Sequence, residues 1–321
     1  MAALMWILHA EQPLKPGDLC HALAVEIRSP NLNTDNVPSI GTLLACCQGL
    51  IFVDKEASTV RLIHFTLQEY LLAHPELFGT PHSTIAETCL GYLNSQQVKA
   101  LSTSPPSNVQ DVPFLEYSSL YWGIHAKKDF SACVKLLMLQ LFDDCENHIS
   151  TRIILGKRDP WHPIDLNKPS LFSSLHCASI FGINKIVAGL VKVEGCDVNK
   201  KDCSGYTPLT WAALGGHEGV VKILLGRDDI NPDKPSNDGE TPLHFAVFGW
   251  HEGVVKTLLG RSDVNPNKPD HLGQTPLCCA ALSRNEAVAK ILLERNGVNP
   301  DKLDYYGRTP LQYAAARGRR E

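Results

Sequence analysis

Apolar residues recur with helical spacing along most of the chain, and one pattern repeats at a fixed interval. The string Gly-x-Thr-Pro-Leu occurs four times, starting at Gly205, Gly239, Gly273 and Gly307, each 34 residues after the last. In this string glycine permits a positive φ in a tight turn, threonine can cap a helix through its hydroxyl, and proline suits the first helical position. Each copy therefore predicts a turn followed by the start of a helix.

A second apolar pattern follows the first at the same period. Small residues such as Ala212 and Ala213 come after the string, and then a short segment places apolar residues at i, i+1, i+4 and i+5, as at 218–225, 252–259 and 286–293. This spacing gives a helix one buried face. A period of 34 residues is typical of a stacked array, so each unit is predicted to be two antiparallel helices and a long turn.

These residues resemble the ankyrin repeat. The resemblance rests on Gly-x-Thr-Pro-Leu, the paired alanines, the pair Gly216-His217, the Val-Val-x-x-Leu-Leu helix, and the exits at 197–199, 229–231 and 263–265. It covers about residues 165–321 and implies an ankyrin solenoid with one degenerate, three full and one truncated repeat. The last repeat stops at Glu321 before its second helix, which favours a truncated chain or gene model because arrays usually end in a polar cap.

The first part of the chain has a different pattern. Residues 1–75 predict helices with a turn at 13–17, a helix at about 38–47, two β-rich runs at 50–54 and 59–63, and a helix at 65–72. Helices with one hairpin indicate a winged-helix domain. Residues 76–164 predict a helical connector, with helices at 84–94 and 130–142 and a loop at 102–108. The fold class is therefore mainly α: a winged helix, a connector and a solenoid.

Three strings in this part carry a second resemblance: 47–56 (CQGLIFVDKE), 58–71 (STVRLIHFTLQEYL) and 114–126 (FLEYSSLYWGIHA). The first two are similar to the winged-helix segment that follows the NACHT domain in fungal STAND proteins, a segment also called the GPI inositol-deacylase winged-helix domain. The third is similar to the connector that joins this segment to ankyrin repeats. In that family nucleotide exchange moves the winged helix and permits oligomerisation, and the repeats sense a ligand or partner.

Charge and cysteine content exclude several classes of function. The 321 residues carry a net charge of −4, and residues 38–50 hold no charged side chain, so we expect no nucleic-acid binding. Eleven cysteines occur without any CxxC pair, which indicates reduced, buried thiols and an intracellular, cytoplasmic protein that could also enter the nucleus. No apolar run is long enough for a spanning helix, so we expect no membrane partner.

Sequence motifs of catalysis are also missing. The chain contains neither the P-loop string that cradles phosphates nor the Gly-x-Ser-x-Gly elbow of a deacylase. His217-Glu218 begins a zinc-binding His-Glu-x-x-His string, but Val221 occupies the second ligand position. We therefore expect no enzyme activity, cofactor or metal.

A protein partner is expected on the concave side of the array, where turn tips and first helices lie. The residues predicted to line this surface flank the repeated glycines or follow the alanine pairs: Tyr206, Leu214, Glu240, Phe248, Trp250, His271, Leu272, Gln274, Arg284, Tyr305, Tyr306 and Arg308. Aromatic and arginine side chains are typical of binding hot spots. Trp250 stands where the repeat normally has glycine.

Two functions follow from these patterns. The first is a non-enzymatic scaffold that binds a protein through its ankyrin repeats. The alternative is the regulatory and sensor tail of a nucleotide-switched NACHT/STAND ATPase whose catalytic domain is absent from this chain, and which would form oligomers. The identity of the partner does not follow from the sequence, because such surfaces encode affinity in shape and side-chain identity rather than in a motif.

Overall fold

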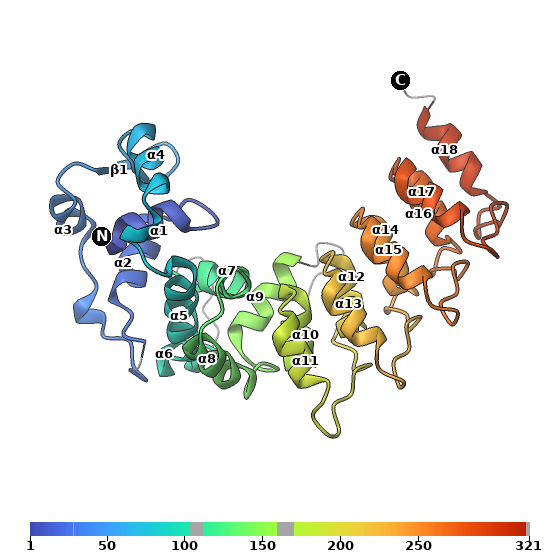
Figure 1. Cartoon of the computed structure of the whole chain (residues 1–321), viewed down its shortest axis with the longest axis horizontal. Helices are drawn as coiled ribbons and strands as arrows, with labels where there is room; N and C mark the ends of the chain where they lie inside the picture. Colours follow the sequence, from blue (N-terminus) through green and yellow to red (C-terminus); the bar gives the residue numbers. More distant parts are fainter. Residues whose placement is uncertain (28, 103–111, 159–169, 319–321) are drawn as a thin grey trace. The chain divides into compact units, whose positions relative to one another are not determined.

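The computed structural model describes residues 1–27, 29–102, 112–158 and 170–318. Within this part of the chain, helices dominate and the single sheet has two strands (Figure 1). The prediction of a mainly α fold with one hairpin is thus confirmed. Contacts divide the chain into two compact units, Met1–Leu166 and Asn167–Glu321, which are described separately below. Most of the predicted loop at 102–108, and the predicted boundary between 164 and 165, lie outside the described residues.

The first unit begins with short helices around a hairpin. Strands β1 and β2 pair antiparallel, with Ile51 opposite Leu62 and Val53 opposite Val60. Ile51 and Val60 are buried together with Trp6 and Leu19, so this part has its own apolar core. The elements are α1 (Ala2–His9), α2 (Pro16–Ala24), η1 (Thr34–Asn36), α3 (Ile40–Cys46), β1 (Ile51–Asp54), β2 (Thr59–Leu62), α4 (Phe65–Ala73) and η2 (Pro75–Leu77).

Five helices in the described residues follow in the first unit. They are α5 (Pro81–Asn94), α6 (Gln96–Ala100), α7 (Leu115–Lys128), α8 (Ala132–Phe142) and α9 (Ile149–Arg158), and α5 packs against both α7 and α8. Trp6 of α1 meets Phe114 edge-on, with ring centroids 5.5 Å apart, and also meets Tyr117 of α7 at 5.8 Å. These aromatic contacts hold α1 against the connector helices and so place the loop after α1 beside α5 and α7.

The second unit is a row of helix pairs. Its elements are α10 (Ser174–Phe181), α11 (Asn184–Leu190), α12 (Pro208–Leu214), α13 (Glu218–Leu225), α14 (Pro242–Phe248), α15 (Glu252–Leu259), α16 (Pro276–Leu282), α17 (Glu286–Leu293) and α18 (Pro310–Gly318). The first helix of each pair packs against the first helix of the next, and second helices pack in the same way (Figure 1). The second helices α13 and α15 bury both valines and both leucines of the repeated pattern, whereas Leu293 of α17 and Leu311 of α18 are more than half exposed.

Two buried histidines connect consecutive helix pairs. His244 shares a hydrogen bond through Nδ1 with the hydroxyl of Thr241, the cap of its own helix, and its Nε2 lies 3.2 Å from the carbonyl oxygen of Gln274 in the next turn. His176 makes the corresponding contact with the carbonyl of Tyr206 at 3.1 Å. At the same repeat position Thr210 instead shares a hydrogen bond with Thr207, 3.0 Å away. The histidines therefore add a link between pairs that a shorter side chain does not supply.

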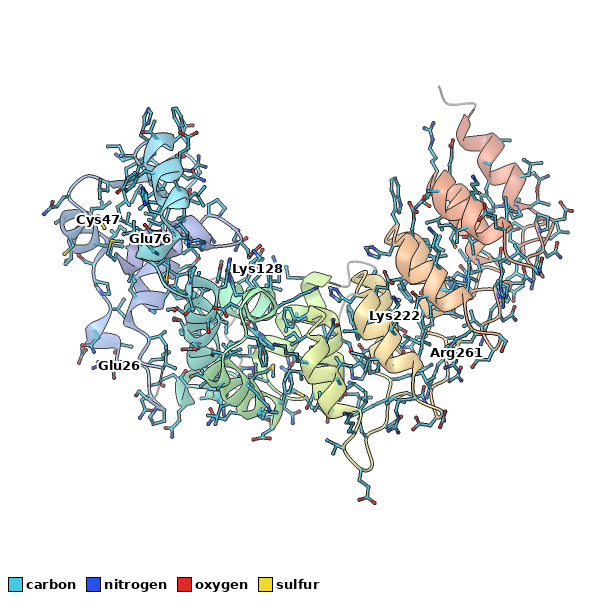
Figure 2. All side chains as sticks on the ribbon, in the orientation of Figure 1. Glu26, Cys47, Glu76, Lys128, Lys222 and Arg261 are labelled. Carbon is cyan, nitrogen blue, oxygen red and sulfur yellow. The ribbon has the colours of Figure 1, made fainter. Side chains whose placement is uncertain are left out.

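Arginines link the second helices. The guanidinium of Arg227 donates to the carbonyl of Val191 at 2.7 Å and pairs with Asp229 at 2.8 Å. Arg261, labelled in Figure 2, repeats the arrangement by donating to the carbonyl of Leu225 and pairing with Asp263. These contacts satisfy carbonyl groups at the ends of helices, which otherwise lack intrahelical partners. They make the spacing between pairs regular.

Candidate partner-binding surface

Exposed side chains of the second unit gather at two places in each helix pair. One is the tip of the long turn before the first helix, and the other is the short link after it. The first helices α12, α14 and α16 are seven residues long, which separates their ends by about 10 Å. The predicted partner-binding residues therefore form two rows, a turn-tip row and a helix-end row, at opposite ends of the first helices.

The turn tips have a fixed backbone. Asp270 accepts hydrogen bonds through Oδ1 from the amides of Leu272 and Gln274, both at 2.8 Å. Successive tips are joined by backbone hydrogen bonds, such as His271 N–H to Asp238 O at 2.9 Å and Tyr305 N–H to Leu272 O at 3.0 Å. A surface held in this way needs little ordering when a partner binds.

Tyr206 corrects one sequence-based expectation. Its side chain is completely buried, with its ring edge-on to Trp211 at 5.1 Å and to Phe245 at 4.7 Å. It fills the space between two helix pairs and is not exposed to a partner. The sequence pattern missed this because turn position alone does not show that a bulky ring can fold back under its own turn.

The other turn-tip residues differ in exposure. Tyr305 and Tyr306 are 74% and 65% exposed, and His271 and Arg308 are also at the surface. Leu272, Gln274 and Glu240 are half-buried: Gln274 donates to the hydroxyl of Tyr313 at 3.1 Å, and Glu240 accepts from the hydroxyl of Ser236 at 3.0 Å. Four exposed side chains, all from the last two described turns, thus supply most of this row.

Arg308 is held in place between two rings. Its guanidinium carbon lies 4.6 Å from the centroid of Tyr306 and 4.6 Å from that of Tyr313, and its Nε pairs with Asp304 at 3.1 Å. A cation over an aromatic face is stabilised by the ring quadrupole. Tyr306 and Arg308 therefore present one preformed aromatic and cationic surface.

The helix-end row contains Leu214, Phe248, Trp250 and Arg284. Leu214 is half-buried, Phe248 is 38% exposed and Trp250 is 60% exposed, while Arg284 lies at the surface. The backbone of Trp250 is left-handed, with φ of 60°, and Arg284 has φ of 56°. A left-handed backbone costs a residue other than glycine about 1–2 kcal/mol.

Glycine occupies the same position in the two preceding pairs. Gly182 and Gly216, 68 and 34 residues before Trp250, both have φ of 69°. A Cβ atom on Gly216 would lie 2.5 Å from the ring of His251, and one on Gly182 would lie 2.6 Å from His217. After Trp250 the corresponding residue is Asn285, so that histidine ring is absent. The packing permits a side chain at 250, but the backbone there still favours glycine.

An apolar groove that no sequence motif marks lies beside Arg284. It has a volume of about 650 Å³ between α16, α17 and α18, and its walls include Leu277, Ala281, Ala289, Leu293, Leu311 and Ala314. Leu293 and Leu311 are 55% and 74% exposed. Alanines are part of the groove lining, and a one-dimensional pattern cannot distinguish a packed alanine from one that lines a groove.

Two further observations concern the whole described chain. None of the eleven cysteines forms a disulfide, and six of them are buried, as is typical of packing thiols: Cys20, Cys89, Cys145, Cys177, Cys278 and Cys279. Among the described residues, no helix has both the length and the apolar character that crossing a bilayer requires.

Family models match the repeats and the first part of the chain. Residues 175–270 and 249–321 match the family model of ankyrin repeats (3 copies), and residues 1–79 match the winged helix domain of GPI inositol-deacylase. No curated protein matches the sequence. The chain thus contains ankyrin repeats and a winged-helix domain of the GPI inositol-deacylase type, which confirms these two parts of the sequence-based prediction.

Proposed function

We propose that this chain is a non-enzymatic module for protein–protein interaction, in which the ankyrin repeats bind a protein partner on their concave face. The observation that carries the proposal is Trp250. Its ring is 60% exposed on a backbone where the two preceding repeats have glycine. A large exposed ring at a strained backbone position does not stabilise the fold, but it can contribute contacts to a bound partner.

The surface favours a partner with apolar and acidic side chains. Trp250, Phe248, Tyr305 and Tyr306 offer exposed aromatic rings, and Arg284 and Arg308 offer cations beside them. Tryptophan, tyrosine and arginine dominate the energetics of protein interfaces. The groove beside Arg284 provides room for an apolar side chain of the partner.

Replacing Trp250 with glycine should separate binding from folding. The backbone strain is relieved, so we expect the free energy of unfolding to stay constant or to rise by about 1 kcal/mol. Loss of a hot-spot ring should weaken partner binding by about 2 kcal/mol or more, roughly 30-fold. Partners captured by the full chain in cell extract would be identified by mass spectrometry, purified, and titrated against both proteins.

The control variant is Lys222→Ala, which removes an exposed side chain of α13 (Figure 2). Lys222 belongs to a second helix, whereas both rows lie at the ends of first helices. This variant should bind as the wild type does. Adding Tyr306→Ala to the Trp250 variant should abolish binding. A folded double variant that still captures the same partner with unchanged affinity would contradict the proposed site.

A second candidate function is the regulatory and sensor tail of a fungal NACHT/STAND ATPase, whose nucleotide-binding domain would belong to the same native polypeptide. The winged helix supports it, because Ile63, Phe65, Tyr70 and Leu72 of the hairpin and α4 are all more than half exposed. An apolar surface of this kind is typical of contact with another domain. In this case the winged helix (1–75) and connector (76–164) would transmit a signal to the repeats (165–321), and the protein would form oligomers.

The mass of the native protein distinguishes the two candidates. An antibody against the repeats would be used on a lysate of the source cells. A band near 35.3 kDa supports a free-standing cytoplasmic scaffold, and the free thiols of the chain agree with such a reducing compartment. A much heavier band supports the ATPase tail.

A further inference from the structure

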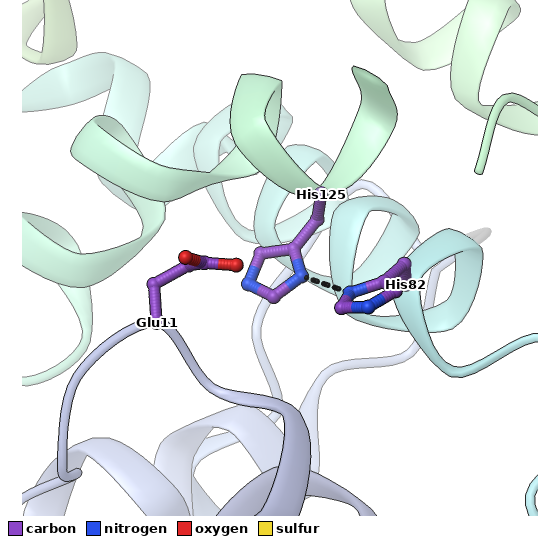
Figure 3. A group of neighbouring side chains, drawn as sticks. All are labelled: Glu11, His82 and His125. Atoms are coloured by element: carbon purple, nitrogen blue, oxygen red, sulfur yellow. Dashed lines mark hydrogen bonds between the residues drawn. The ribbon is translucent and has the colours of Figure 1, made fainter. Parts of the chain in front are cut away.

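Three ligand-type side chains meet within the first unit. Glu11 comes from the loop after α1, His82 from the first turn of α5, and His125 from the last turn of α7 (Figure 3). One nitrogen of each histidine and one carboxylate oxygen of Glu11 all lie within 4.8 Å of one another. The Nδ1 atoms of His82 and His125 face each other at 2.8 Å.

A neighbouring tyrosine orients His125. The hydroxyl oxygen of Tyr117 accepts the backbone N–H of Glu11 at 3.1 Å and lies 2.9 Å from Nε2 of His125. It can accept an Nε2–H proton as a second hydrogen bond, which leaves the lone pair of His125 on Nδ1, directed at His82. Metal-binding histidines typically donate their other ring N–H in this way, because the contact sets the tautomer and the ring orientation.

The charge states of the three residues are compatible with binding a cation. His125 is fully buried, and burial lowers its pKa to about 3, so its imidazole is neutral at physiological pH. Burial also lowers the pKa of His82 and of His9, whose ring centroid lies 5.5 Å from that of His82. Lys128 Nζ pairs with Oε1 of Glu11 at 2.5 Å, which leaves the second carboxylate oxygen available.

His9 adds an independent sign of an incomplete site. Its Nε2 is buried and has no hydrogen-bond partner among the described residues. Buried polar atoms without a partner are uncommon and call for an explanation such as a bound ion or water. A cation or its bound water beside His82 would give this nitrogen a partner.

We propose that Glu11, His82 and His125 bind a divalent transition-metal ion, with Zn²⁺ as the best fit. Two imidazole nitrogens and one carboxylate oxygen are a ligand set that zinc uses, with one tetrahedral position left for water. Two nitrogens on a tetrahedral zinc ion lie about 3.3 Å apart, so the rings need to separate by roughly half an ångström. Mg²⁺ and Ca²⁺ prefer oxygen ligands and fit the pair of imidazoles poorly.

The bound ion would connect three segments of the first unit. Glu11 belongs to the winged helix, whereas His82 and His125 belong to the connector helices α5 and α7. Zinc would replace one hydrogen bond between the two histidines with three metal bonds across this junction. Zinc is therefore expected to raise the thermal unfolding midpoint of the first unit.

The test uses the full chain, treated with a chelator and then freed of it, and titrated calorimetrically with ZnCl₂. One site is expected whose affinity falls at least about 10-fold in His82→Asn and in Glu11→Gln. His74→Ala is the matched control, because this histidine belongs to the same unit, is partly exposed and pairs with Glu76; the change should not alter the affinity. Both test residues are accessible enough to be replaced without loss of the fold, which circular dichroism would verify.

Cobalt distinguishes this site from the thiols. The eleven cysteine thiols could also bind zinc, but Co²⁺ bound by thiolate shows an intense charge-transfer band that nitrogen and oxygen ligands do not produce. The proposal expects visible ligand-field bands without that band, and their loss in His82→Asn. A wild-type chain that binds no metal, binds it with the thiolate signature, or binds it equally well in all variants would overturn the proposal.

Discussion

At pH 5 the ankyrin unit is expected to be about 4 kcal/mol less stable than at about pH 7.5 or above, because two buried histidines resist protonation. His176 and His244 are fully buried, and burial lowers the pKa of each to about 4. Both rings form hydrogen bonds to carbonyl groups of the following turn, which partly offset the effect of burial but do not reverse it.

The sign follows from the two protonation states. In the unfolded chain each histidine has a pKa near 6.5 and gains a proton below that pH. The folded unit does not gain it until about pH 4, so the unfolded state binds more protons between pH 6.5 and pH 4. The free energy of unfolding therefore decreases as the pH is lowered through this window, by about 1.4 kcal/mol per pH unit for each histidine. Above about pH 7.5 the unfolded-state histidines are largely deprotonated too, so the two histidines contribute little pH dependence there.

Urea unfolding of the full chain at several pH values would measure this slope. The comparison variant is His176→Thr with His244→Thr, which copies the residue that Thr210 provides at the same repeat position. The variant should be less stable at pH 7, because it loses the hydrogen bonds between pairs, but its stability should fall less steeply with acid. Carboxylates and the histidines of the first unit titrate in both proteins and so cancel in the difference. Parallel pH profiles for the two proteins would show that these histidines are not kept neutral by the fold.

Replacing Trp211 with alanine is expected to lower the free energy of unfolding by about 4 kcal/mol. The indole is 1% exposed and packs edge-on against Tyr206 and Phe172. Its Nε1–H donates to Oδ2 of the buried Asp202 at 2.7 Å. The substitution leaves a large cavity and also removes a hydrogen bond to a buried carboxylate, and these two costs add.

A double variant separates the two costs. In the next repeat, Phe245 replaces the tryptophan and Ser236 replaces the aspartate, and the serine hydroxyl accepts the turn amides of Asp238 and Glu240, both at 3.2 Å. Trp211→Phe alone should cost about 2 kcal/mol because it removes a charge-assisted hydrogen bond. Trp211→Phe with Asp202→Ser copies the next repeat, so it should be less destabilised than the sum of the single variants, by about 1 kcal/mol. Chemical unfolding of the four proteins gives this coupling, and strictly additive effects would contradict it.

Sequence reasoning predicted the repeats and the winged helix because both depend on local rules. The 34-residue period, the capping threonines and the first-turn prolines specify where helices begin, and Thr207 and Thr275 do cap their helices. The hairpin follows from two β-rich runs and a short turn. The candidate surface was predicted only in part: Trp250 and Tyr306 are exposed as expected, whereas Tyr206 is buried between two repeats.

The sequence by itself determined the order of the domains, the period of the array and the position of each helix start, because these depend on residues that are neighbours along the chain. Only the tertiary structure decided which side chains meet across helices. It divided the proposed surface into two rows, buried Tyr206, and brought Glu11, His82 and His125 within 4.8 Å of one another. No spacing in the sequence marks that cluster, because its members lie on a loop and two helices that approach each other only when α1, α5 and α7 pack around Trp6 and Tyr117.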